Sequence, residues 1–329
     1  MNSFVLDMME QSARELVEQV GNGVNRAYVG ERNGEPCVIC VVEKKKPTKD
    51  LAADVFIPRI YSQRDSTGNE HRFRTRVEEG PVCETLQLYV SKEAGLLYAG
   101  KQSSDTQNLQ SCHDFPLRGG VQIAPLGAGW VGTLGGACVR DAHYGLVTNY
   151  HVANGGEYGK DAAICQPHGS GPRFGEQSDW VPIRFDDSVN LVDCSFVRSE
   201  NLDKKQYGVI PEQVNIGKIN PHYWDEADVK LGMKVQKVGR TTGHTRGEIV
   251  GVRSTSYVSY GQEGTAKFEK QFVVRGLNGS NFSAGGDSGS LVLDMDNRPV
   301  GLLFAGGGSD TIINPIEFVV SRLKVKFFS

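Results

Sequence analysis

The sequence predicts a mainly β protein that begins with a small α/β unit. From Gly119 to about Asp310 the chain consists of short apolar runs separated by glycines, as in GTLGGACVR, VDCSFVR and SLVLD. Regular short strands with turn signals between them are typical of an all-β sandwich or barrel. The 40 glycines among 329 residues fit an architecture with many tight turns. Residues 1–95 have a different pattern, which combines one helix with a few strands.

In this first unit, residues 3–20 predict an amphipathic helix that ends at Gly21. Its apolar face contains Val5, Met8, Met9, Leu16, Val17 and Val20. Strand-like runs follow at 25–31 and 36–43, on either side of the hairpin signal Asn33-Gly34. Further runs at 54–61 and 81–90 complete the unit.

The polar residues 96–117 predict a linker, and residues 118–329 predict a second, larger domain. This domain ends with a helix over 315–325. Its apolar positions recur at helical spacing at Ile316, Val319, Val320 and Leu323.

Composition and charge argue against several functional classes. A net charge of −3 does not favour nucleic acid as a partner, and no run approaches the roughly 18 apolar residues of a membrane span. The N-terminal residues lack the basic start and apolar run of a signal peptide. The seven cysteines lie mostly in apolar runs, which predicts reduced thiols in a cytoplasmic protein. Cys37 and Cys40 have redox or zinc spacing, but no second ligand pair follows, so we expect neither a metal nor a cofactor.

The strongest chemical signal is the run from Gly285 to Ser290, GGDSGS, just before a strand-like run. A serine is a nucleophile only when a base takes its proton and donors stabilise the oxyanion. Flanking glycines allow a tight turn that aims backbone N–H groups inward, so Gly286 and Ser288 are the candidate donors. A glycine-rich hairpin turn and a phosphate-binding loop are the alternatives. A phosphate loop normally leads into a helix, whereas this run leads into a strand, which favours Ser288 as a nucleophile.

A general base and an acid can be assigned from context. Among the seven histidines, His151 stands out because the apolar run GLVTNYHVAN places it directly before a turn of small residues. Asp193, in NLVDCSFV, precedes another apolar run, where a carboxylate is costly unless it is paired. Asp186 and Asp187 are competing acids in FDDSVN, which has the composition of a solvated turn.

These motifs resemble those of the trypsin-like, chymotrypsin-fold serine peptidases. TNYHVA, NLVDCSFV and GGDSGSLV occur in the His–Asp–Ser order of that family. The chain looks most similar to the intracellular bacterial and plant branch related to the rice Narrow leaf 1 protease. The similarity includes GTLGG, the GRTTG run over 239–247, VGLLFAG over 300–306 and the N-terminal segment NGEPCVICVVEKKKP.

The resemblance implies two six-stranded antiparallel β-barrels of chymotrypsin type, over about 118–205 and 226–312, with the active site between them. It implies His151, Asp193 and Ser288 as the catalytic triad. Phe304, Ala305 and Gly306 would lie along the substrate backbone. Phe282 stands at the pocket-floor position where trypsin-specific members carry an acid, so an apolar or small pocket is expected, although Asp310 is close enough in sequence to reach it.

The function we expect is therefore a serine endopeptidase that acts on a protein substrate. A low-turnover binding or regulatory module on the same fold and a small-ester hydrolase are the alternatives. Secreted relatives are activated when a new N-terminus pairs with the acid before the serine, here Asp287. Arg118 marks a site where such a cut is conceivable, although a simple domain junction explains it as well. The resemblance also allows assembly into homo-oligomers.

Overall fold

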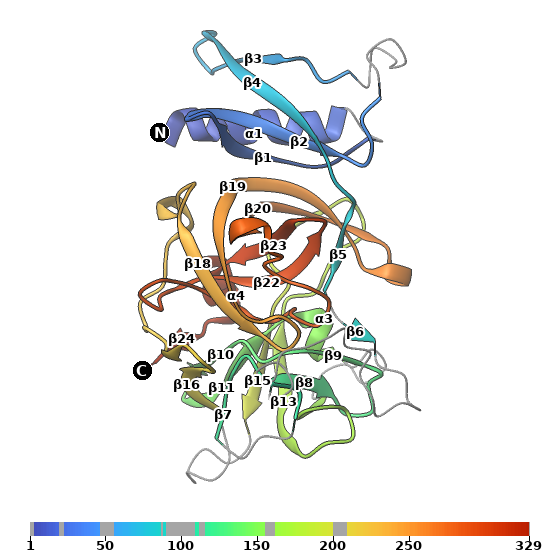
Figure 1. The fold of residues 1–329 in the computed structure, drawn as a ribbon, viewed down its shortest axis with the longest axis vertical. Helices are drawn as coiled ribbons and strands as arrows, with labels where there is room; N and C mark the ends of the chain where they lie inside the picture. The colour runs from blue at the N-terminus through green and yellow to red at the C-terminus, as the bar shows by residue number, and fades with distance from the viewer. Residues whose placement is uncertain are drawn as a thin grey trace.

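The computed structural model describes residues 3–19, 23–46, 56–86, 88–89, 109–111, 116–154, 162–199 and 209–328. Most of the predicted linker over 96–117, the last helical position Val20 and the cysteine Cys112 lie outside these residues. Figure 1 shows three layers: an N-terminal layer at the top, the strands of the C-terminal half in the middle, and the strands of the central part of the chain at the bottom.

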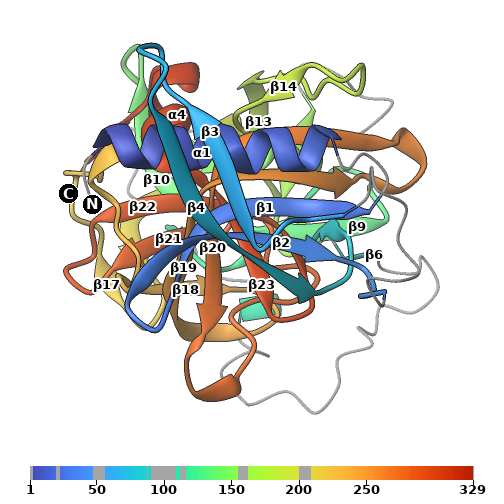
Figure 2. The same cartoon turned by 90° about the horizontal axis from the view of Figure 1, so that it is seen from above.

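The N-terminal layer has a helix on one side of a hairpin, as predicted. Its elements are α1 (Ser3–Gln19), β1 (Val24–Arg32), β2 (Glu35–Val42), β3 (Ile60–Arg64) and β4 (Glu70–Glu79). At the predicted turn Asn33 has φ 53° and Gly34 has φ 78°, so a two-residue loop joins β1 to β2 in the left-handed conformation that this dipeptide tolerates. Viewed from above, α1 and the β3–β4 ribbon lie across the layers below them (Figure 2).

The bottom layer contains the first antiparallel barrel. Its elements are β8 (Gln122–Pro125), β9 (Trp130–Thr133), β10 (Gly136–Arg140), β11 (His143–Thr148), α3 (Tyr150–Ala153), β12 (Ala163–Cys165), β13 (Arg173–Trp180) and β15 (Ser195–Ser199). A separate three-stranded sheet consists of β7 (Leu117–Gly119), β16 (Val209–Gln213) and β17 (Gly217–Lys218), and β14 (Val189–Asn190) pairs with β20 (Thr265–Gly276) of the second barrel. The strand order is β10-β11-β15-β13-β12-β8-β9. Since β9 leads directly into β10, the two ends of this sheet meet, and β9 and β10 act as one bent strand of six.

The middle layer is a second closed barrel. Its elements are β18 (Lys234–Gly239), β19 (Gly243–Ser259), β20 (Thr265–Gly276), β21 (Leu291–Asp294), β22 (Pro299–Gly307) and β23 (Asp310–Pro315), followed by α4 (Ile316–Leu323) and β24 (Lys326–Phe327). The order β20-β23-β22-β21-β18-β19 closes because β19 also pairs with β20. Every pairing in this ring is antiparallel. The predicted mainly β fold with two six-stranded barrels and a preceding α/β unit is confirmed.

The N-terminal layer shares a sheet and a core with the second barrel. The strand β1 pairs with β19, with Ala27 opposite Thr255, so the barrel sheet continues into β1 and β2. The buried face of α1 belongs to the same apolar cluster as Val274 and Ile313 of the barrel; its members in the helix are Met8, Met9, Ala13, Leu16 and Val17. Full burial of a side chain such as Leu16 contributes about 1.5–3 kcal/mol. Packing against the barrel therefore holds this helix in place.

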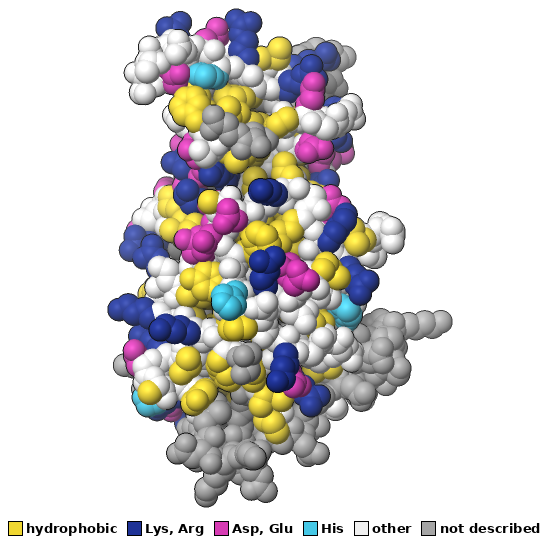
Figure 3. All heavy atoms as spheres, turned by 90° about the vertical axis from the view of Figure 1, so that its left-hand side faces the viewer, with side chains coloured by type: hydrophobic (Ala, Val, Ile, Leu, Met, Phe, Trp, Pro, Cys, Tyr) yellow, Lys and Arg dark blue, Asp and Glu magenta, His cyan; other side chains and the backbone are white. Residues whose placement is uncertain are grey.

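Two further features bear on the predicted partners. Figure 3 shows a face on which acidic and basic side chains alternate, in keeping with the small net charge of −3. Among the described residues, no helix combines the length and apolar character needed to cross a membrane.

Candidate active site

The strand pairing of the first barrel brings His151 and Asp193 together. In the ladder between β11 and β15, Thr148 stands opposite Ser195. His151 follows the end of β11 in the single turn of α3, and Asp193 precedes β15, so both lie at the same end of the strand pair. The Nδ1 atom of His151 lies 2.5 Å from Oδ2 of Asp193, and the His151 backbone N–H donates to Oδ1 at 3.3 Å.

The protonation of the His151 ring follows from its partner. A carboxylate only accepts hydrogen bonds, so Nδ1 carries the proton in this contact. In the neutral ring Nε2 then bears the lone pair. This Nε2 is buried and has no hydrogen-bond partner among the described residues. His151 is thus prepared to take a proton at Nε2.

Asp193 is held from several directions and is fully buried. The hydroxyl of Tyr260 donates to Oδ2 at 2.8 Å, the atom that also faces His151. The backbone of Asp193 is bonded as well: its N–H donates to Oδ1 of Asn314 at 3.0 Å, and its carbonyl accepts from Nδ2 of Asn149 at 2.8 Å. Burial, followed by the nearby Asp193 charge, raises the pKa of Tyr260 well above its ordinary value, so this phenol remains a donor.

The competing acids lie elsewhere. Asp186 and Asp187 are exposed, and Asp187 adopts a left-handed backbone conformation with φ 62°. The hydroxyl of Ser188 and, at 3.4 Å, its backbone N–H donate to the carboxylate of Asp186, and these local turn contacts lower the pKa of Asp186. The structure brings Asp193, and neither of these two residues, to His151.

Ser288 lies in a loop whose backbone requires glycine. Gly286 has φ 97°, and a Cβ at that position would lie 2.5 Å from Oγ1 of Thr241. The loop is tied to the first barrel by Thr133, whose N–H donates to the Ser288 carbonyl at 2.8 Å and whose hydroxyl donates to the Gly286 carbonyl at 2.9 Å. The Ser288 hydroxyl donates to the carbonyl of Phe304 at 3.1 Å. It is therefore bonded to β22 and not to His151 in this structure.

The N–H groups of Gly286 and Ser288 converge on one acceptor. Both donate to the carbonyl oxygen of Leu86, from Ser288 at 3.4 Å and from Gly286 at closer range. Two backbone donors on a single carbonyl oxygen form the geometry of an oxyanion hole. The structure therefore places the two predicted donors around a peptide carbonyl.

The expected substrate wall lies beside this carbonyl. Phe304, Ala305 and Gly306 belong to β22, and the Phe304 carbonyl accepts the N–H of Leu86 at 3.2 Å. Phe282 is buried, and its own carbonyl accepts from Thr245 at 2.8 Å.

Asp310 does not extend into a pocket as a free acid. It is buried and ion-paired with Arg26 at 2.6 Å and with Arg275 at 2.5 Å. Both of its oxygens are therefore engaged by guanidinium groups.

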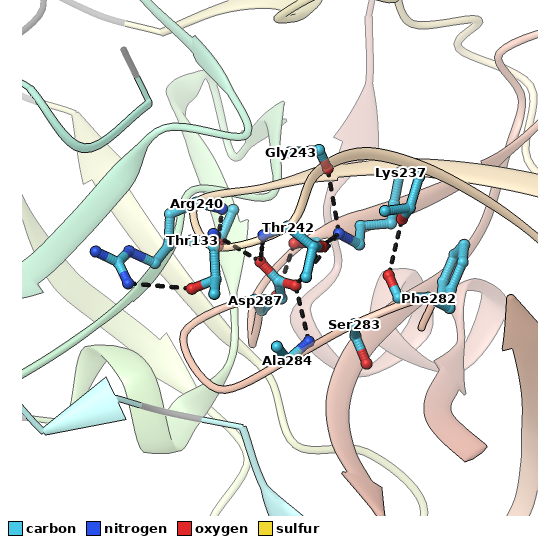
Figure 4. Close-up of polar contacts among 12 residues, drawn as sticks. Thr133, Lys237, Arg240, Thr242, Gly243, Phe282, Ser283, Ala284 and Asp287 are labelled. Atoms are coloured by element: carbon cyan, nitrogen blue, oxygen red, sulfur yellow. Dashed lines mark hydrogen bonds and ion pairs between the residues drawn. The ribbon is translucent and has the colours of Figure 1, made fainter. Parts of the chain in front are cut away.

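Asp287, the acid before the serine, forms an ion pair with a buried lysine (Figure 4). Lys237 Nζ lies 3.3 Å from Oδ2 of Asp287, and both side chains are fully buried. The carboxylate also accepts from the Thr242 hydroxyl at 2.6 Å and from the backbone N–H groups of Thr241 and Ala284 at 2.9 and 3.0 Å. Burial lowers the pKa of Lys237, and the Asp287 charge opposes that shift.

This arrangement bears on the suggested activation cut. Arg118 lies inside β7 and pairs with Glu212 at 3.2 Å. The acid that a new N-terminus would have to reach, Asp287, already has an ammonium partner within the intact chain. Cleavage after Arg118 is thus not needed to supply one.

The cysteines of the described residues form no disulfide bond. The six cysteines among the described residues are free and buried, including Cys37 and Cys40. Within the described ranges, no group of three or more His, Cys, Asp or Glu side chains could hold a metal ion.

One family model matches part of this chain. A family model described as the Nal1 C-terminal domain matches residues 195–315. This stretch contains the second barrel and Ser288 but neither His151 nor Asp193. A search of curated proteins finds no match.

Several solved structures are similar to this chain. Thermobifida fusca Protease A is 19% identical over 65% of this chain and 100% of its own, with a TM-score of 0.47. The Nocardiopsis protease NAPase is 18% identical over 65% of this chain and 100% of its own, with a TM-score of 0.48. A glutamic acid specific serine protease is 18% identical over 64% of this chain and 100% of its own, with a TM-score of 0.47. Because these identities and TM-scores are low, the chemistry of the site rests on the residues of this chain.

Three residues of the site were not foreseen from the sequence. Asn314 and Lys237 are polar residues inside apolar strand-like runs, which is a usable signal because such groups must find partners when buried. Tyr260 carries no such signal. It stands at the end of β19, and only the packing of the two barrels brings its hydroxyl to Asp193.

Proposed function

We propose that this chain is a serine endopeptidase in which His151, Asp193 and Ser288 act on a peptide bond of a protein substrate. One observation carries the proposal: the N–H groups of Gly286 and Ser288 hold a peptide carbonyl. This loop lies close to the His151–Asp193 pair, because a Cβ added at Gly132 would meet both the Ser288 carbonyl and the side chain of Val152, the neighbour of His151. The carbonyl that the two N–H groups hold belongs to Leu86 of this chain and stands in for the carbonyl of a substrate.

The proposed reaction uses these groups in the order that their chemistry dictates. Ser288 Oγ attacks the carbonyl carbon while Nε2 of His151 takes the hydroxyl proton. The oxygen becomes negative and is stabilised by the two backbone donors. Asp193 holds the ring through Nδ1 and offsets the positive charge that develops on it. His151 then protonates the leaving amine, and water hydrolyses the acyl-enzyme with His151 as the base.

One rearrangement must precede attack. The Ser288 hydroxyl donates to the Phe304 carbonyl, and His151 Nε2 has no partner among the described residues. A rotation about the Cα–Cβ bond of Ser288 would exchange the first contact for one with Nε2.

The alternatives make different demands on the site. The antiparallel pairing of a peptide segment with Ala305 and Gly306 favours peptides over small esters, because main-chain hydrogen bonds give affinity to an extended chain. The orientation of the Ser288 hydroxyl away from His151 is the observation that favours a low-turnover binding module. Activity decides between this module and an enzyme.

The test is labelling with a fluorophosphonate probe, combined with hydrolysis of peptides. Wild type should be labelled, Ser288→Ala should not, and Ser290→Ala, which removes a neighbouring hydroxyl bonded to the Asp287 carbonyl, should retain labelling. Peptides should be hydrolysed faster than a small ester that carries the same acyl residue. A folded wild-type protein that neither reacts with the probe nor hydrolyses peptides would show that the fold serves binding alone.

We also propose that the enzyme works in the cytoplasm. Its described cysteines are free thiols, and burial raises the pKa of Cys40 to about 12 and that of Cys83 to about 11, so both stay protonated. Buried free thiols of this kind are typical of reducing compartments. Assembly into homo-oligomers, expected from the resemblance, can be measured by sedimentation.

A further inference from the structure

A segment of the N-terminal part of the chain runs through the candidate active site. After β4 the chain leaves the top layer and descends along the second barrel towards the first (Figure 1). Here β5 (Cys83–Thr85) pairs in parallel with β19 and antiparallel with β22. Thr85 stands opposite Ala305 and Glu84 opposite Gly306. The segment thus occupies the edge of β22 where a substrate backbone was expected.

Leu86 makes the contacts that a peptidase makes with the residue before the cut. Its N–H donates to the Phe304 carbonyl at 3.2 Å, and its carbonyl oxygen accepts from the N–H groups of Gly286 and Ser288. Its side chain lies against Gly306, where an added Cβ would come within 3.0 Å of Leu86 Cδ1. The wall beside Leu86 is therefore open only because position 306 is glycine.

The chain continues on the other side of this carbonyl. In β6 (Leu88–Tyr89), Leu88 stands opposite Val131 and Tyr89 opposite Trp130 of β9. The strands that flank Leu86 thus pair with different barrels, β5 with the second and β6 with the first. Backbone pairing before and after a carbonyl helps to position it for attack.

A buried guanidinium anchors the segment from behind. Arg26 is 2% exposed, and its Nη1 donates to the Pro81 carbonyl at 3.0 Å and to Sγ of Cys83 at 3.3 Å. The other side of the same guanidinium pairs with Asp310 at 2.6 Å. Since Cys83 is also fully buried, the backbone segment just before Leu86 packs into the core.

The segment also closes the site to other peptides. Ser288 has no exposed surface and His151 is 8% exposed, although a nucleophile must be reached by its substrate. We propose that this chain is its own first substrate, and that Ser288 cuts the peptide bond on the carboxyl side of Leu86 within the same molecule. This inference rests on the proposed peptidase function.

The reaction balances with water as the single co-reactant. Ser288 Oγ bonds to the Leu86 carbonyl carbon, and its proton passes to His151 Nε2. The C–N bond to the next residue then breaks, and that nitrogen leaves with the proton from His151. Water releases the acyl group and leaves a carboxylate on Leu86. The products are fragments 1–86 and 87–329, and removal of the first fragment's end from the site opens it to other peptides.

The experiment is an intact-mass time course on purified full-length protein, with N-terminal sequencing of any new fragment. Wild type should yield fragments 1–86 and 87–329, and Ser288→Ala should remain whole. Because the segment and the serine belong to one chain, the cleaved fraction at a given time should not change when the protein is diluted tenfold.

Two substitutions of Leu86 test the pocket beside Gly306. Leu86→Met keeps an apolar side chain of similar size and should be cut as in wild type. Leu86→Asp should be cut at least about a hundredfold more slowly, because its unpaired carboxylate would lose hydrating water against an apolar wall. Glu84→Gln is the matched control on the same strand, since the Glu84 side chain is exposed, and it should be cut normally. A thermal midpoint close to that of Ser288→Ala, which also stays whole, shows that Leu86→Asp is folded.

The outcomes separate this inference from the proposed function. Wild type that reacts with the probe and hydrolyses added peptides, yet stays whole or is cut elsewhere, overturns self-cleavage and leaves the peptidase standing. Cleavage after Leu86 that also occurs in Ser288→Ala, or whose rate rises with protein concentration, overturns the intramolecular reaction. A protein that is neither labelled nor active fails both proposals.

Discussion

The hydroxyl of Tyr260, from the second barrel, donates to the same carboxylate oxygen of Asp193 that faces His151 in the first. The bond crosses the interface between the barrels, so the orientation of the His151–Asp193 pair depends on how the two barrels pack.

Tyr260→Phe should lower kcat/KM for peptides by roughly tenfold to a hundredfold, since a hydrogen bond to a charged group contributes about 1.5–3 kcal/mol. The ring remains to fill its space, so the thermal midpoint should change little. Tyr28→Phe is the matched control: this tyrosine is also buried, but its hydroxyl accepts from Arg275, outside the site. Equal losses in the two variants would contradict the role assigned to Tyr260.

Asp193→Asn should reduce kcat by about 10⁴-fold while the protein stays folded. An amide can donate to Nδ1 of His151, which would place the ring proton on Nε2, where it cannot accept from Ser288. Steady-state kinetics on a peptide substrate measures the loss. Asp186→Asn, at one of the competing acids, should have wild-type kinetics, and a comparable loss there would mean that the wrong acid has been assigned.

Lys237→Met should destabilise the protein by about 3–5 kcal/mol, because it leaves Asp287 buried without its cation. Activity should fall as well, since Asp287 lies in the loop with the donors Gly286 and Ser288. Urea unfolding and peptide hydrolysis measure the two effects. Lys234→Met is the control: this lysine is exposed and pairs with Glu248 at the surface, a contact worth about 0–1 kcal/mol.

The double variant Lys237→Met/Asp287→Asn separates stability from chemistry. It removes the unpaired charge, so it should recover part of the lost stability. A double variant as unstable as Lys237→Met alone would show that the ion pair is not the cause.

Acid should loosen the contact between the N-terminal layer and the second barrel. Burial pushes the pKa of Asp310 upward, but the hydrogen bonds and charges of Arg275 and Arg26 outweigh this effect, so the pKa lies below its ordinary value. A lowered carboxyl pKa in the folded state adds stability above the unfolded value of about 3.9, and this stability is lost as the pH falls through the folded value. The midpoint temperature of thermal unfolding should therefore decrease as the pH is lowered below about 4.

In Asp310→Asn, the thermal midpoint should fall less steeply at acid pH than in wild type. Asp296→Asn, at an exposed residue, should show the same fall as wild type. Because Arg26 also holds Pro81 and Cys83, Asp310→Asn should speed the access of added peptides to Ser288. If the thermal midpoint of Asp310→Asn fell at acid pH as steeply as that of wild type, Asp310 would not be the origin of the pH dependence.

The sequence predicted the elements well where local chemistry dominates. The α1 helix follows an apolar stripe, the β1–β2 hairpin follows an Asn-Gly turn, and α4 follows its spacing. The choice of His151 and Asp193 came from polar residues at the ends of apolar runs, a signal that holds because buried charges need partners. Tyr260 could not be predicted, since nothing in its local sequence marks a contact that forms between two barrels.

By itself, then, the sequence determined the mainly β fold and which serine, histidine and aspartate to consider, whereas the two barrels were implied by the family resemblance. These features are encoded locally, in periodicity, turn residues and short motifs. Tertiary structure alone decided that Lys237 neutralises Asp287, that Asp310 is engaged by two arginines, and that Leu86 lies under the N–H groups of Gly286 and Ser288. These contacts join residues far apart in the chain. They form only when β1 pairs with β19 and β5 pairs with β22.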